Sequence, residues 1–206
     1  MSRGRSLNDS YTARLEPVLT LFEFISVAYS LVLSFAVVRL LGGVSDVFAP
    51  GRRYWIHCAW LCLQILGVLV AWWTFWSYRT IEWNVFRFLL IIAGPGLVYL
   101  QASALIPPDP SSVDCWKDHY YRTRGLMFGA GAIWLALLGI HSYVLLDFPL
   151  LHSRRALNVV FIAGMTVAAV SGRKSVHTVI TVGYTIGVVF FLTAFLFDPD
   201  SWALQR

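Results

Sequence analysis

A carboxylate and a row of hydroxyl groups share one face of the first long apolar stretch of the chain. Ser26, Ser30 and Ser34 follow Glu23 at offsets of 3, 7 and 11 residues. These offsets place all four side chains on one side of an α-helix, which turns once in about 3.6 residues. A carboxylate at the head of a lane of hydroxyl groups is suited to passing a proton or a cation. The alternative is that Glu23 pairs with a cation and only holds helices together.

Three further polar residues are expected at a depth similar to that of Glu23. Arg87, His141 and Asn158 each lie near an end of an apolar stretch, and the order of the stretches along the chain brings these ends to one side. An unpaired charge in a hydrocarbon environment costs about 3 kcal/mol. We therefore expect Glu23, Arg87, His141 and Asn158 to meet, and we favour a structural ion-pair network over a working site. The sequence indicates only their depths, and not which faces meet.

Histidine and cysteine residues gather toward the opposite ends of the same stretches. Cys115 and His119 could bind a metal ion, with His57 or Cys58 as a third ligand. Structural zinc sites usually show paired short spacings, which this arrangement lacks. A haem held by His57 and His177 has no better support, because two axial histidines produce no characteristic spacing in a sequence. We expect no metal and no cofactor, and we place His57 and His177 at an interface with their polar edges in water.

The elements that carry these residues are long and apolar. The chain has 206 residues, of which 58% are hydrophobic and 13% charged, and its mean hydropathy is +0.66. A soluble domain has about twice that fraction of charged residues, and a helix needs about 20 apolar residues to span a membrane. We predict an all-α polytopic membrane protein, a compact bundle of six helices in one domain, 1–206. The predicted spans are about 18–41, 54–77, 84–106, 125–146, 156–172 and 176–197, of which the fifth is the shortest.

The third predicted span contains a Gly-Pro-Gly sequence at its centre. Pro95 has no N–H to donate to the carbonyl of Ile91, so we expect a kink there. Gly94 and Gly96 allow neighbouring helices to close around the bend. Lipid has no donor for the freed carbonyl, so a neighbouring hydroxyl group or a trapped water must supply one. Residues 94–96 are therefore a candidate hinge, and bending without a ligand is the alternative that we favour.

Small residues recur at intervals of about four in several spans, which allows helix backbones to approach closely. The pattern predicts a tight bundle, argues against a wide pore, and would also suit the docking of partner helices. The clearest examples are Gly125, Gly129, Ala132, Ala136 and Gly139 in the fourth span, Gly164, Ala168 and Gly172 in the fifth, and Gly183 and Gly187 in the sixth.

Charge does not orient the chain in a membrane. Seven Arg or Lys residues fall on each side of the predicted bundle, so the positive-inside rule gives no answer. The simpler interpretation is that both termini lie in the cytoplasm. The other is that two copies insert in opposite orientations and form an antiparallel dimer. The isoelectric point is near 9.3, but the basic residues are spread over every loop and do not form the polybasic run typical of nucleic-acid binding. We expect a lipid bilayer as the environment and no nucleic acid as a partner.

Several motifs resemble those of small six-helix proteins of bacterial inner membranes. They are the Phe-Glu-Phe-Ile-Ser run at 22–26, the aromatic residues Trp55, Trp60, Phe75 and Trp76, and the run His119-Tyr120-Tyr121. The resemblance implies a multi-pass protein of the inner membrane and brings no assigned activity or catalytic residue. The layout also resembles prokaryotic relatives of the lysosomal potassium channel, but the first span lacks their Phe-Ser-Asp signature.

Three classes of function follow from these features. The first is a small channel or transporter for an ion, a proton or a small polar solute, with Glu23 and the serine lane as its pathway. The second is a non-catalytic accessory or sensor subunit that binds other membrane helices, either of its own kind or of another membrane protein. A lipid-headgroup enzyme using Asp118 and His119 comes third, since no phosphate-binding loop or known hydrolase motif is present. We therefore expect no enzyme.

Overall fold

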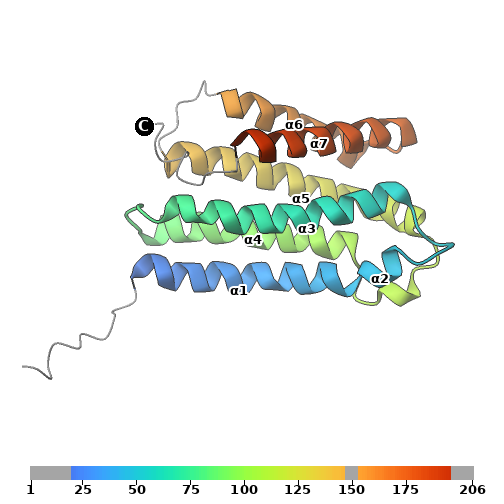
Figure 1. The fold of residues 1–206 in the computed structure, drawn as a ribbon, viewed down its shortest axis with the longest axis horizontal. Coiled ribbons are helices and arrows are strands. Elements are labelled where there is room, and N and C mark those ends of the chain that lie inside the picture. The colour runs from blue at the N-terminus through green and yellow to red at the C-terminus, as the bar shows by residue number, and fades with distance from the viewer. Residues whose placement is uncertain (1–19, 147–152, 196–206) are drawn as a thin grey trace, which may run out of the picture.

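The computed structural model describes residues 20–146 and 153–195, and these residues form a bundle of long, roughly parallel and antiparallel helices (Figure 1). The prediction of an all-α bundle of six helices is confirmed. The six are α1 (Leu21–Gly42), α3 (Trp55–Phe75), α4 (Val85–Leu105), α5 (Trp116–Val144), α6 (Ser153–Val170) and α7 (Lys174–Phe195). Three short elements connect them, namely α2 (Val44–Val47), η1 (Trp76–Tyr78) and η2 (Pro110–Ser112).

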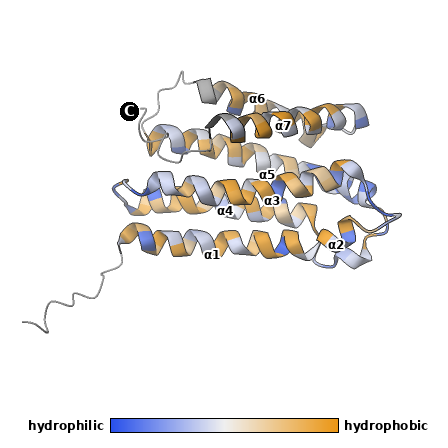
Figure 2. Cartoon of the chain, in the orientation of Figure 1, coloured by the Kyte–Doolittle hydropathy of each residue, from blue (hydrophilic) through white to orange (hydrophobic). Residues whose placement is uncertain are grey.

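The helices have the length and composition of membrane spans. Five of the helices in the described residues are long and apolar enough to cross a membrane, and the apolar part of α6, Ala156–Val170, is shorter. Figure 2 shows hydrophobic residues along the helices and hydrophilic residues gathered at their ends. This pattern is compatible with a multi-pass membrane protein. The outermost residues of the first and last predicted spans, 18–19 and 196–197, lie outside the described residues.

The order of packing follows the chain except at two places, the contact of α1 with α4 and the contact of α7 with α3. Helix α1 packs against α4 and α3, α4 packs against α5, and α5 packs against α6. Helix α7 packs against both α6 and α3, so that α1 and the α6–α7 pair lie at opposite edges (Figure 1). We name the two ends of the bundle by α1: side A is the end at Leu21, and side B is the end at Gly42.

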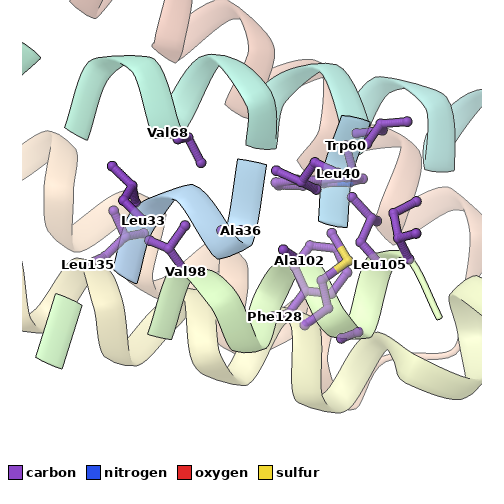
Figure 3. Packing of buried hydrophobic residues seen from close by; sticks show 14 of the residues in the cluster. Leu33, Ala36, Leu40, Trp60, Val68, Val98, Ala102, Leu105, Phe128 and Leu135 are labelled. Carbon is purple, nitrogen blue, oxygen red and sulfur yellow. The ribbon is translucent and has the colours of Figure 1, made fainter. Parts of the chain in front are cut away.

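The packing of α1 follows a regular sequence pattern. Its buried residues recur every three or four positions, which places them on one face of the helix. Small residues at this contact bring the backbones close: Ala36 of α1 and Ala102 of α4 are both completely buried. Figure 3 shows these alanines among the larger core side chains Leu33, Leu40 and Val98. Close approach matters here because two helices in lipid gain little from the hydrophobic effect.

The Gly-Pro-Gly sequence lies within one continuous helix. Helix α4 is α-helical on both sides of Pro95, and the expected kink stays a prediction. Gly94 is buried against the indole ring of Trp134 in α5, and a Cβ atom added to Gly94 would overlap that ring. Gly96 differs, because an added Cβ would meet nothing within 4 Å. Gly94 therefore sets the distance between α4 and α5, and Gly96 does not.

Side B is closed by a short network of polar groups. Arg52 donates hydrogen bonds to the carbonyls of Ser111 (3.1 Å) and Val113 (2.9 Å), and it lies 3.7 Å from the carboxylate of Asp46. The indole N–H of Trp116 donates to the carbonyl of Asp46 at 2.9 Å. Helix α5 begins at this tryptophan, well before the expected edge at residue 125, so the second half of the 107–124 connection is helical.

We predict opposite effects for two neighbouring substitutions in α4. Gly96→Ala should raise the free energy of unfolding, because alanine favours a helix over glycine by about 1 kcal/mol. Gly94→Ala should lower it by about 1–3 kcal/mol, because the new methyl group forces Trp134 out of its position. Unfolding of the purified protein by SDS titration in mixed micelles measures both values. Equal effects of the two substitutions would contradict this account of the α4–α5 contact.

Candidate binding site: a cavity between four helices

A cavity of about 270 Å³ lies in the half of the bundle nearer side A. Most of its wall comes from α3, α5, α6 and α7, with Tyr29 of α1 and Ile91 of α4 completing it. An apolar cavity of about 150 Å³ can hold a benzene molecule, so this one has room for a larger guest. It falls near the lower limit of the volumes typical of small-molecule sites.

The wall of the cavity is mainly aliphatic and aromatic. Leu63 and Leu66 line it from α3, Leu138 from α5, and Val188 and Leu192 from α7. Such a surface favours the body of an apolar molecule. It disfavours a bare ion, because an isolated charge loses its hydration there and finds no opposite charge in exchange.

Two polar side chains lie together on this wall, near the ends of their elements at side A. The imidazole of His141 is 1% exposed, and its Nε2 atom lies 3.0 Å from the carbonyl oxygen of Leu90. A carbonyl accepts only, so Nε2 carries the proton, and Nδ1 is left as an acceptor with no hydrogen-bond partner within 20–146 and 153–195. The ring of Tyr78 lies 6.2 Å from that of His141. The cavity thus combines an acceptor and a hydroxyl group with an apolar wall.

His141 bonds to α4 next to the turn that contains Pro95. Pro95 cannot donate to the carbonyl of Ile91, so this turn of α4 has one hydrogen bond fewer than an ordinary turn. The imidazole of His141 donates to the adjacent carbonyl, that of Leu90. The side chain therefore ties α5 to the weakened turn of α4.

Asn158 holds α6 in place where this helix lines the cavity. Its amide N–H donates to the carbonyl of Leu135 at 2.9 Å and so joins α6 to α5. Gly139 makes room for this contact, because a Cβ atom there would lie 3.3 Å from the Asn158 amide nitrogen. Tyr184 of α7 lies deeper, with its ring 4.6 Å from Phe161 and 5.0 Å from Trp60. The small-residue spacing of α5 thus serves, at Gly139, to bring α6 to the cavity.

The four residues expected to meet at side A take two different roles. His141 and Asn158 both line the cavity, whereas Glu23 and Arg87 do not. Glu23 is exposed and caps its own helix, accepting hydrogen bonds from the backbone N–H (2.7 Å) and the hydroxyl (3.0 Å) of Thr20. Arg87 donates to the carbonyl of Glu82. The four side chains therefore form no ion-pair network with one another.

The serine lane of α1 lies beside the buried face of that helix. Ser26 and Ser34 donate to carbonyls of α1 itself, each at 2.7 Å. Ser30 instead accepts a hydrogen bond from the indole N–H of Trp72 in α3, at 3.0 Å. Each of the three hydroxyl groups therefore has a hydrogen-bond partner within the protein, which lipid could not supply. Their role as a pathway stays a prediction, and none of the three lines the cavity.

A second cavity of about 50 Å³ adjoins the first and extends toward the middle of the bundle. Trp134 and Tyr184 line both cavities. Gln101 of α4 lines the smaller one, and its buried amide nitrogen has no hydrogen-bond partner in the described part of the chain. Buried polar atoms are nearly always paired, so this amide favours a bound water or a polar ligand atom at that point.

Sequence reasoning found His141 and Asn158 as polar residues at membrane depth, but it did not find the cavity. The cavity results from the spacing between helices, and no residue pattern signals it. Tyr78, which also lines the cavity, was not among the predicted site residues. Comparison of the chain with known protein families, curated proteins and solved structures found no match.

We predict that His141→Leu lowers the free energy of unfolding by about 1 kcal/mol, because it removes the donor that α5 supplies to α4. Hydrogen bonds between membrane helices are worth about 0.6 kcal/mol on average and up to about 1.7 kcal/mol. Ser142→Ala is the matched control, since the Ser142 hydroxyl donates within its own helix, to the carbonyl of Gly139. SDS titration of the three proteins checks the difference. A His141→Leu protein as stable as the control would contradict the proposed link.

Proposed function

We propose that this protein is a non-enzymatic, multi-pass protein of the bacterial inner membrane that binds a small amphipathic molecule and carries it within or across the bilayer. The observation that carries the proposal is the apolar cavity with one unpartnered acceptor, Nδ1 of His141. A well-formed apolar pocket with a few convergent polar groups is the usual form of a small-molecule site. The function belongs to the transporter class expected from the sequence.

The chemistry of the cavity favours one class of ligand. Nδ1 of His141 requires a donor, such as a hydroxyl group or a protonated carboxyl group. The hydroxyl of Tyr78 can donate in turn to an oxygen atom on the same ligand. The aliphatic wall suits a short hydrocarbon body beside this polar end. A neutral small molecule with one oxygen-bearing end meets all three requirements better than an ion does.

A cavity-filling substitution in α7 tests the proposal. We predict that Val188→Trp strongly reduces the binding of a medium-chain fatty acid that carries a photoreactive diazirine, because Val188 lines the cavity. Val189→Trp is the control, since the next residue is 53% exposed on the outer surface of the same helix. Labelling of the protein in liposomes, followed by peptide mapping, gives both the extent and the site of capture.

Two results would overturn this proposal. One is labelling that falls equally in the two tryptophan variants, and the other is labelling confined to the outer surface of the bundle. Flux of the same fatty acid into liposomes separates carriage from binding alone. The Glu23→Gln variant tests the sequence-based pathway in this assay, and our proposal expects its flux to equal that of the wild type because Glu23 lies outside the cavity.

A second candidate is an accessory subunit that binds helices of another membrane protein or of a second copy. Gly129 and Gly183 favour it, because an added Cβ would meet nothing within 4 Å at either position and both therefore have room for a partner. Gly183→Leu should then leave the isolated protein folded and abolish its assembly. Crosslinking in native membranes, followed by identification of the crosslinked chains, distinguishes this candidate. An unchanged crosslinking pattern would exclude an interface at Gly183.

A further inference from the structure

Two imidazole rings lie together inside the bundle near side B, far along the helices from the cavity. His57 comes from the first turn of α3 and is completely buried, and His119 comes from the first turn of α5 and is 5% exposed. Their ring centroids are 5.9 Å apart. Neither residue lines either of the two cavities described above. This histidine pair is therefore a separate feature of the fold.

Three of the four ring nitrogens of the pair have no hydrogen-bond partner among the residues that the structure describes. Both nitrogens of His57 are unpartnered, as is Nδ1 of His119. The fourth, Nε2 of His119, lies 3.1 Å from the carbonyl oxygen of Ala104, so it carries the proton and leaves a lone pair on Nδ1. A buried polar group without a partner is rare in native proteins and usually marks a missing water, ion or ligand.

The distance between the rings favours an atom placed between them. The two rings form no direct hydrogen bond with each other. Two metal–nitrogen bonds of about 2 Å each, with the ion between the rings, place the centroids about 6 Å apart, close to the observed separation. Nδ1 of His119 already has the arrangement of a metal ligand, because the opposite nitrogen of the same ring is held by a backbone carbonyl.

The surroundings restrict which ion can bind. The described residues contain no group of three or more His, Cys, Asp or Glu side chains that could hold a metal. Zinc usually takes four ligands, and magnesium and calcium take oxygen ligands that are not present here. A divalent ion would also bury two charges with no carboxylate beside them. Two neutral, buried imidazoles suit a monovalent ion that accepts two ligands in a line, which is the preference of copper(I).

An aromatic side chain completes the site. The indole of Trp116 is fully buried, with its ring 4.8 Å from that of His57 and 5.5 Å from that of His119. The face of an indole attracts a cation through its quadrupole, so Trp116 can offset part of the buried charge. Its N–H is held by the carbonyl of Asp46, which fixes the orientation of the ring. We propose that His57 and His119, with Trp116 beside them, bind one copper(I) ion at side B.

Cysteine does not account for this site, although the sequence paired Cys115 with His119 as potential metal ligands. Cys115 is exposed before the first turn of α5, and the nearest polar partner of the Cys58 thiol is the carbonyl of Val47, at 3.7 Å. The sequence named His57 and His119 as possible ligands only beside Cys115, and it expected no metal, because it left the direction of His119 open. Once α5 begins at Trp116, its first turn directs His119 toward α3.

The test is copper(I) binding by the full-length protein in detergent, without oxygen and with a reductant present. Competition with a coloured copper(I) chelator gives the affinity and the number of ions per chain. We predict one ion per chain for the wild type and for Cys115→Ser, and binding at least a hundredfold weaker for His57→Leu and His119→Leu. Loss of an outer partner of a metal ligand already weakens binding about 10- to 100-fold, so loss of a ligand itself should weaken it more.

X-ray absorption of the wild-type copper complex keeps the test independent of whether the variants fold. We expect two nitrogen neighbours at about 2 Å and no sulfur. The copper-free His57→Leu protein should also melt at a higher temperature than the wild type, because the substitution removes unpartnered polar atoms from the interior. Three results would overturn the proposal: no copper(I) retained by the wild type, sulfur among its neighbours, or wild-type affinity in either histidine variant.

Discussion

Lipid offers no hydrogen-bond donor or acceptor, and this constraint decides where the polar side chains of the bundle lie. The serine hydroxyl groups of α1 bond within the helix or to Trp72, and Glu23 bonds to Thr20 at the start of its own helix. The same constraint acts most strongly at Pro95, where α4 lacks one N–H. Beside this turn, the imidazole of His141 donates from α5 to the carbonyl of Leu90, so it joins two helices. It also places on the wall of the cavity a nitrogen that has no hydrogen-bond partner among the described residues.

The two ends of the bundle differ in how α7 meets its neighbours within the described residues. Near side B, the indole of Trp60 in α3 donates to the hydroxyl of Thr181 in α7 at 2.9 Å, and His177 of α7 bonds to Tyr120 of α5 at 2.8 Å. Toward side A, the cavity occupies the space between the two helices, from Tyr184 onward in α7. Helix α7 is therefore bonded to its neighbours near side B and separated from α3 by a cavity toward side A.

The sequence predicted the number and class of the helices because apolar stretches of membrane length leave few alternatives. It also predicted the depth of His141 and Asn158, since depth follows from position along a helix. Depth does not determine rotation: Glu23 has a similar depth, yet it lies on the exposed surface. Gly94 is a second case in which the sequence indicates a property of a residue but not its neighbour. Its small size indicated a close contact, but only the structure identifies Trp134 as the neighbour.

The central claim is that the cavity between α3, α5, α6 and α7 holds a small amphipathic molecule. The most direct measurement is an electron cryomicroscopy map of the protein taken from native membranes in lipid nanodiscs, with a bound antibody fragment to add mass. The account predicts elongated density in the cavity, with its polar end within hydrogen-bonding distance of Nδ1 of His141. A cavity closed by direct packing of α7 on α3, with no density between them, would contradict it.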